Sequence, residues 1–97
     1  MAYNIEIRPL ARIDIWEAYD WYELKKDGLG IEFLDELDSF FKIVQQNPFT
    51  FSFYDWPVRQ GSLIRFPYTV VYEVLNNTIV IYTIFMTRQD PSKKRTQ

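Results

Sequence analysis

The chain has 97 residues, a formal net charge of −2, and neither cysteine nor histidine. Without cysteine it has no disulfide or thiol nucleophile, and without histidine it lacks the commonest general base and the commonest zinc ligand. The longest uncharged run, 74–87, is too short to span a bilayer, and residues 1–12 lack the apolar core of a signal peptide. We therefore expect one small cytoplasmic domain over residues 1–97, with no cofactor and no bound metal.

The N-terminal half predicts one strand followed by two helices. Residues 3–8 alternate polar and apolar side chains, which is the period of a strand, and Pro9 ends it. From 10 to 26 the apolar residues recur every three or four positions, which predicts an amphipathic helix. A second helix of this kind runs from 31 to the pair Asn47-Pro48. The short connector between them favours an antiparallel helical hairpin.

The C-terminal half predicts the centre of a sheet. Two runs rich in β-branched and aromatic residues, 65–74 and 78–86, flank Asn76-Asn77, a pair that tolerates the positive φ of a tight turn. We expect a third strand over 58–66, and a loop over the core at 48–58, where prolines flank an aromatic-rich stretch. The sequence therefore predicts an α+β fold in which an N-terminal strand and a two-helix hairpin are packed on an antiparallel β-sheet.

A two-residue turn at Asn76-Asn77 would also fix the register of the hairpin. Strict alternation then places Phe85 on the same face as Val70, and Ile84 on the opposite face. The opposed pairs that we predict are Tyr72 with Ile81 and Val70 with Thr83.

Charge is distributed unevenly along the chain. Residues 1–58 carry 5 basic and 11 acidic side chains, whereas residues 59–97 carry 6 basic and 2 acidic ones. A basic C-terminal half can bind an acidic partner or a phosphate while the whole chain stays acidic, although a solvated basic tail would give the same count. The residues that we predict to bind a target, close together on one side of the sheet, are Arg59, Arg65, Tyr68, Tyr72, Arg88 and Arg95.

The sequence offers little for catalysis. A Ser-His-Asp triad, a zinc site and a glycine-rich phosphate loop are all absent from it. The acidic run at 35–38 has the spacing of a solvated helix face. In the first helix we expect Trp21 in the core, and we predict that Trp16 is either a core residue or an exposed contact for a protein partner.

The order and spacing of several motifs resemble the RelE/ParE toxin superfamily, on the side of its ParE-like, plasmid-stabilisation branch. The resemblance covers nearly the whole chain. The matching pieces are Ala11-x-x-Asp14 with Ala18 and Trp21-Tyr22, Gly28-Leu29-Gly30-x-x-Phe33, Asn47-Pro48, Arg59, Arg65-Phe66-Pro67-Tyr68-x-Val70-Val71-Tyr72-Glu73-Val74, Ile79-x-Ile81-x-x-Ile84-Phe85 and Arg88-x-Asp90-Pro91.

This resemblance implies a small toxin that forms a hetero-oligomer with a cognate antitoxin, for which Trp16 is the predicted contact. RelE-like members cleave mRNA on the ribosome, whereas ParE-like members poison DNA gyrase without hydrolysing nucleic acid. The ribonucleases carry an arginine where this chain has Thr69, and a lysine pair where it has residues 62–64. ParE-like chains commonly carry a histidine where Met86 stands.

We therefore expect a ParE-like toxin component of a type II toxin–antitoxin system that acts by binding a target such as DNA gyrase. Two alternatives remain open from the sequence. One is a RelE-like, ribosome-dependent mRNA endoribonuclease, for which Arg65, Arg88 and Tyr68 are the candidate catalytic residues. The other is an attenuated homologue that only binds an antitoxin.

Overall fold

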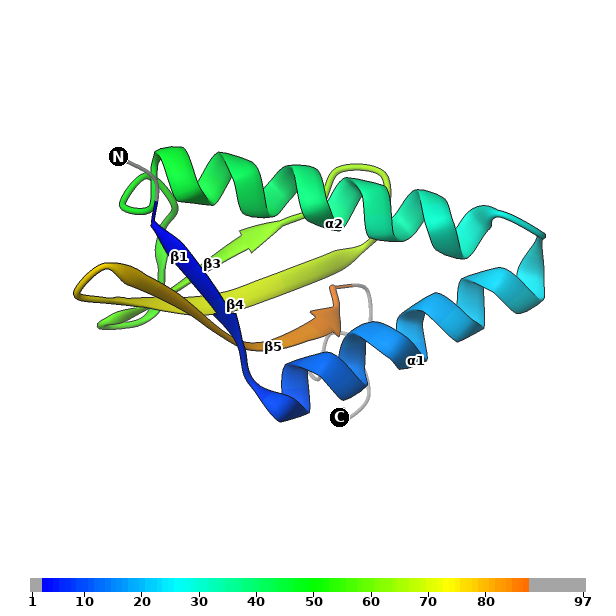
Figure 1. Ribbon diagram of the computed structural model, residues 1–97, viewed down its shortest axis with the longest axis horizontal. Helices are drawn as coiled ribbons and strands as arrows, with labels where there is room; N and C mark the ends of the chain where they lie inside the picture. Colours follow the sequence, from blue (N-terminus) through cyan, green and yellow to red (C-terminus); the bar gives the residue numbers. More distant parts are fainter. Residues whose placement is uncertain (1–2, 88–97) are drawn as a thin grey trace, which may run out of the picture.

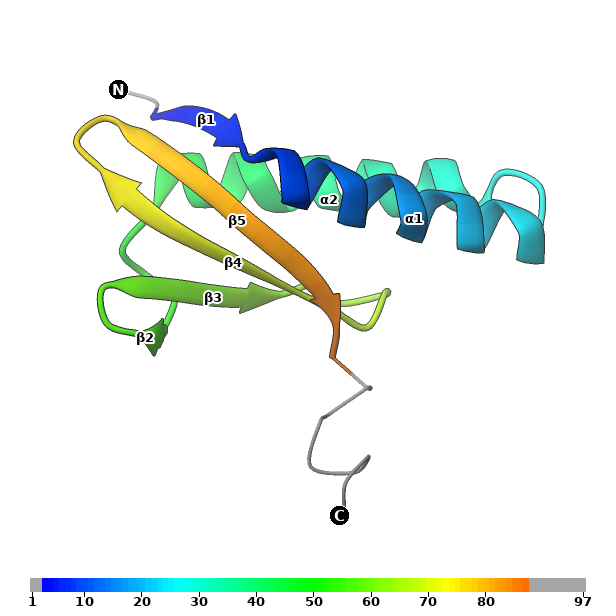
Figure 2. The same ribbon diagram turned by 90° about the horizontal axis from the view of Figure 1, so that it is seen from below.

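Two helices lie side by side over one face of a five-stranded sheet (Figure 1, Figure 2). The computed structural model describes residues 3–87, so Arg88 and Arg95 lie outside the described residues. In chain order the elements are β1 (Asn4–Ile7), α1 (Pro9–Lys25), α2 (Leu29–Gln46), β2 (Phe53–Asp55), β3 (Val58–Ser62), β4 (Tyr68–Leu75) and β5 (Thr78–Met86).

The strand order across the sheet is β1-β5-β4-β3-β2. The four strands β2 to β5 pair antiparallel, and β1 adds to the edge of β5 in parallel. This arrangement confirms the predicted α+β fold with a helical hairpin on one face. Several boundaries differ from the prediction. The helix α2 begins at Leu29 instead of 31, and β4 begins at Tyr68 instead of 65. The strand β3 ends at Ser62 instead of continuing to 66, and part of the expected 48–58 loop forms the short strand β2.

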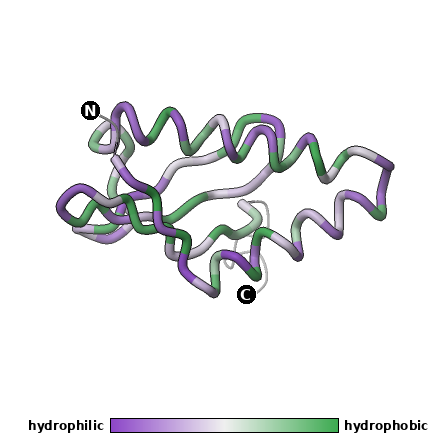
Figure 3. The backbone as a smooth tube through the Cα atoms, in the orientation of Figure 1, coloured by the Kyte–Doolittle hydropathy of each residue, from purple (hydrophilic) through white to green (hydrophobic). Residues whose placement is uncertain are grey.

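The core lies between the helices and the sheet. Hydrophilic and hydrophobic residues alternate turn by turn along both helices (Figure 3), because only one stripe of each helix faces the strands. The buried residues of α1 are Ala11, Ile15, Ala18 and Tyr22, and those of α2 include Phe33, Leu37, Phe40 and Val44. They pack against Val70, Tyr72, Ile79 and Ile81.

A carboxylate holds the turn between the two helices. Gly28 has a φ of 87°, which an L side chain rarely adopts, and it directly precedes α2. The backbone N–H groups of Gly28 and Gly30 donate to the two oxygens of Glu23, at 2.8 and 2.9 Å. Glu23 therefore supplies acceptors and a negative charge to the N-terminus of α2, where unpaired amides and the helix dipole favour both.

The hairpin turn is confirmed, but part of its predicted register is wrong. Tyr72 does lie opposite Ile81, whereas Val70 pairs with Ile84 instead of Thr83, because the register shifts by one residue next to Tyr72. This β-bulge changes which face each later residue occupies. Ile84 therefore enters the core at 3% exposure, and Phe85, predicted on the same face as Val70, is 39% exposed.

Asp14 of α1 binds the bulged part of β5. Its Oδ2 accepts a hydrogen bond from the Thr83 hydroxyl at 2.6 Å and lies 3.4 Å from the backbone N–H of Ile84. One helix side chain thus satisfies polar groups that the irregular strand pairing leaves unpaired.

Neither helix in the described range 3–87 has the length and apolar character that a membrane-spanning helix needs.

Candidate partner-binding site

Arg65 lies on the loop that joins β3 to β4, and α2 holds that loop in place. Glu36 accepts hydrogen bonds from the backbone N–H groups of Ile64, at 2.7 Å, and Arg65, at 3.1 Å. The guanidinium of Arg65 forms an ion pair of 2.7 Å with Glu32, and it lies 5.0 Å from the Phe66 ring centroid. The hydrogen bond from Arg65 lowers the pKa of Glu32. Arg65 therefore stays at the surface, with 59% of its side chain exposed.

Arg59 has a local structural role. Its Nη1 donates to the backbone oxygens of Phe51, at 2.7 Å, and Phe49, at 3.2 Å. The guanidinium also stacks 4.0 Å above the Phe53 ring. These contacts direct Arg59 to the segment before β2, whereas Arg65, beyond the other end of β3, contacts α2. The structure therefore does not bring these two arginines together in one cluster.

The two tyrosines of the predicted site are both buried. Tyr72 has no exposed area, and its hydroxyl donates to the backbone oxygen of Pro48 at 2.9 Å. Burial raises the pKa of Tyr72 to about 12. Tyr72 is therefore a core residue and not a contact for a target, because a side chain without exposed area cannot touch a partner. Tyr68 is 9% exposed and reaches a groove beside α1.

Hydroxyl groups occupy the places where the resemblance puts ribonuclease cations. Thr69 lies 3.2 Å from the Ser62 hydroxyl and 2.7 Å from the Thr87 hydroxyl, forming a row across three neighbouring segments of chain. Thr69 is itself buried, at 4% exposure. This row is neutral, so it gives no charge stabilisation to a pentacovalent phosphate.

The outer side of α1 is unusually apolar for a surface helix. Leu10, Ile13 and Trp16 follow at three-residue spacing, and their exposed fractions are 71%, 53% and 58%. Leu24, close to three turns beyond Ile13, is 87% exposed. Trp16 is thus at the surface, in edge-on contact with Tyr19. We call Leu10, Ile13, Trp16 and Leu24 the outer face of α1.

Sequence reasoning identified Trp16 on this face but missed its aliphatic neighbours. The sequence contained the signal, because apolar residues occur both on the buried stripe of α1 and opposite the sheet. A helix with a fully solvated outer face would show a single apolar stripe. The prediction that Trp21 lies in the core was also wrong, since 47% of it is exposed. Trp21 stands beside the buried stripe of α1, next to Tyr22, and its ring extends outward.

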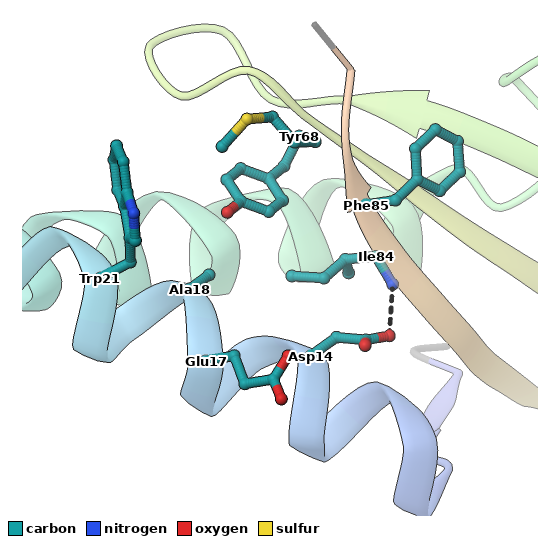
Figure 4. A pocket seen from close by; sticks show the side chains of 8 residues that line it. Asp14, Glu17, Ala18, Trp21, Tyr68, Ile84 and Phe85 are labelled. Atoms are coloured by element: carbon teal, nitrogen blue, oxygen red, sulfur yellow. Dashed lines mark hydrogen bonds between the residues drawn. The ribbon is translucent and has the colours of Figure 1, made fainter. Parts of the chain in front are cut away.

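A groove separates α1 from the ends of β4 and β5 (Figure 4). It has a volume of about 430 Å³, and its wall includes Asp14, Glu17, Trp21, Tyr68, Ile84 and Met86. Within the described residues, no group of three or more Asp or Glu side chains is arranged to hold a metal ion. The groove therefore combines two carboxylates with aromatic and aliphatic walls.

No protein-family model matches the sequence, and neither does any curated protein. Solved structures match its fold. A chain of the chromosomal ParDE TA system from P. aeruginosa has a TM-score of 0.76 at 19% identity, covering 88% of this chain and 96% of that chain. The toxin–antitoxin complex RelBE2 from Mycobacterium tuberculosis gives 0.63 at 16% identity, with 89% and 99% covered. A mutant of E. coli toxin RelE in the free state gives 0.60 at 13% identity, with 97% and 93% covered.

The chain has the RelE/ParE toxin fold. Of these three similarities, the one to the ParDE chain has the highest TM-score, which favours the ParE-like side of the predicted resemblance. In this fold, α1 provides both the exposed apolar residues of its outer face and one wall of the groove.

Proposed function

We propose that the chain is the toxin of a type II, plasmid-stabilisation toxin–antitoxin system, that it acts by binding a target such as DNA gyrase, and that a cognate antitoxin neutralises it. The observation that carries this proposal is the outer face of α1, an exposed apolar surface on a RelE/ParE fold. Large apolar side chains gathered on one helix favour burial by a protein partner.

The chemistry of the sheet supports binding over catalysis. Cleaving RNA through its 2′-hydroxyl needs a proton acceptor, a proton donor and positive charge near the phosphate. The row of Ser62, Thr69 and Thr87 supplies hydroxyls alone, and the ion pair with Glu32 partly neutralises Arg65. A RelE-like endoribonuclease is therefore the weaker hypothesis.

The antitoxin part of the proposal is tested on Trp16. The chain should bind the small protein encoded by the neighbouring reading frame, across an interface of more than about 1,200 Å². Trp16→Ala should weaken binding by more than about 1 kcal/mol, roughly fivefold, because an exposed tryptophan on an apolar face is a typical anchor. Trp56→Ala is the matched control, because Trp56 is 75% exposed but follows β2, away from α1. Equal affinities for wild type and Trp16→Ala would exclude the outer face as the interface.

The ribonuclease alternative has its own experiment. Purified chain mixed with programmed ribosomes should leave A-site mRNA intact. If wild type cleaves the mRNA and Arg88→Ala does not, the function is catalysis and not target binding.

A further inference from the structure

The groove beside α1 contains carboxylates without a cationic partner inside it. Glu17 is exposed and forms no ion pair within the described residues. Asp14 also lines the groove; its Oδ2 binds Thr83 and Ile84, and within residues 3–87 its Oδ1 accepts no hydrogen bond. Lys25 lies 4.4 Å from the Trp21 ring centroid but does not line the groove, so two carboxylates and no lysine or arginine line it within the described residues. The groove therefore favours a cation.

Tyr68 adds a second and independent observation. Tyr68 is only 9% exposed, and its hydroxyl points into the groove in the space above Ala18 (Figure 4). The described part of the chain offers this hydroxyl no hydrogen bond. Burial raises the pKa of Tyr68, with Tyr22 and Asp14 adding to the effect, so the hydroxyl stays neutral. Buried polar groups in proteins nearly always have a partner, so this hydroxyl is available to a polar group that enters the groove.

The surroundings decide which cation fits. A metal ion would need a cluster of ligands, and the described residues contain none. A guanidinium is flat, so it stacks on an aromatic ring, and its several N–H donors reach a carboxylate and a hydroxyl together. The groove offers all three of these partners in the exposed ring of Trp21, the carboxylate of Glu17 and the hydroxyl of Tyr68.

We propose that this groove binds an arginine side chain presented by a partner polypeptide. A polypeptide is the source because the groove opens onto two surfaces that only an extended chain would cover at once. One is the outer face of α1. The other is the edge of β5, where β1 pairs with residues 78–81 and, within the described chain, leaves 82–86 without a neighbouring strand on that side.

The identification of that polypeptide as the antitoxin rests on the proposed function, but the groove itself can be tested without any antitoxin. The probe is N-acetyl-arginine amide, with N-acetyl-citrulline amide as its uncharged control of the same shape. The readout is the indole N–H resonance of each of the three tryptophans in NMR spectra. A failure of this test leaves the toxin proposal standing, and a failure of the toxin proposal leaves the groove standing.

The arginine probe should shift the Trp21 resonance saturably and leave those of Trp16 and Trp56 in place. The citrulline probe should bind at least about tenfold more weakly, since it lacks the charge. Glu17→Gln should weaken arginine binding at least about fivefold, because one carboxylate is lost. Asp20→Asn, which removes an exposed carboxylate of α1 outside the groove, should leave it unchanged.

Tyr68→Phe should also weaken binding while the other resonances stay in place, showing that the fold is kept. No shift of Trp21 at about 50 mM probe, which is far above the millimolar range of weak binding, would overturn the proposal. Equal binding of the two probes would also overturn it. A shortened chain of residues 1–87 that binds arginine about tenfold more tightly would assign the groove to the chain's own basic C-terminus, and so refute an external partner.

Discussion

Replacing Tyr72 by phenylalanine separates a structural role from a binding role. The hydroxyl lies in a fully buried position and donates to the Pro48 backbone oxygen at 2.9 Å. Its removal leaves that buried carbonyl without this donor, which costs about 1–3 kcal/mol in free energy of unfolding. For a domain of this length, about 1 kcal/mol lowers the melting temperature by roughly 4–8 °C. Tyr72→Phe should therefore melt at least about 5 °C below wild type at pH 7, measured by circular dichroism.

The same substitution has a distinct signature in alkali. Burial raises the pKa of Tyr72 from 10.0 to about 12, so between these pH values the folded chain keeps a proton that the unfolded chain releases. Stability from this residue is fully present below pH 10 and is lost as the pH rises toward 12. Two pH units correspond to roughly 2–3 kcal/mol at 1.36 kcal/mol each.

The difference in unfolding free energy between wild type and Tyr72→Phe should therefore shrink as the pH rises from about 10 to 12. Tyr68 and Tyr82, whose pKa values are also raised, are present in both proteins and so do not contribute to the difference. Tyr54→Phe is the matched control, because Tyr54 is 56% exposed. Equal melting temperatures at pH 7, or a difference that stays constant up to pH 12, would refute the assigned hydrogen bond and burial.

Three further substitutions test the contacts that position the candidate site. A Cβ at Gly61 would lie 2.7 Å from the Phe40 ring and 2.9 Å from the Phe51 ring. Gly61→Ala should therefore lower the free energy of unfolding by about 1–3 kcal/mol in urea titrations, with Ser39→Ala as the control. Glu23→Ala should cost about 1–2 kcal/mol by removing the acceptors of the Gly28 and Gly30 amides, and a cost equal to that of Glu17→Ala would contradict this role. Glu36→Gln should speed amide hydrogen exchange at Ile64 and Arg65 about tenfold, whereas Asp35→Asn should not.

Much of the fold could be read from the sequence because its local patterns agree with its tertiary contacts. The Asn76-Asn77 turn and the flanking β-branched runs specify the hairpin without help from the rest of the chain, and Asn76 has the positive φ expected there. The two helices follow from their apolar stripes. The parallel addition of β1 to β5 has no local pattern, because it joins segments more than 70 residues apart.

The β-bulge shows why the register could be predicted only in part. Pairing next to the turn follows from the turn itself, so the pairing of Tyr72 with Ile81 could be predicted from the sequence. The single extra residue beyond it lies where Asp14 of α1 binds the Thr83 hydroxyl. A side chain 69 positions away cannot be recognised from the alternation of the strand alone.

The candidate site was harder to predict, because each arginine is oriented by partners that lie elsewhere in the sequence. The guanidinium of Arg59 donates hydrogen bonds to the carbonyls of Phe49 and Phe51. That of Arg65 donates to Glu32, which is 33 residues away in the sequence. Charge counts predicted a basic surface, but they carry no information on these partners. Arg88 and Arg95 lie outside the described residues, so their place in a target-binding surface stays a prediction.

The central claim is that the chain is a toxin that acts by binding its target, and gyrase supercoiling measures this most directly. Purified chain should inhibit supercoiling of relaxed plasmid by DNA gyrase, and the antitoxin should relieve the inhibition. The Arg65→Ala, Arg88→Ala double variant should inhibit less. Lys42→Ala, which removes a different ion-paired surface cation and lies on α2, should inhibit like wild type. Unaffected supercoiling, together with normal growth of cells that express the chain without antitoxin, would contradict the claim.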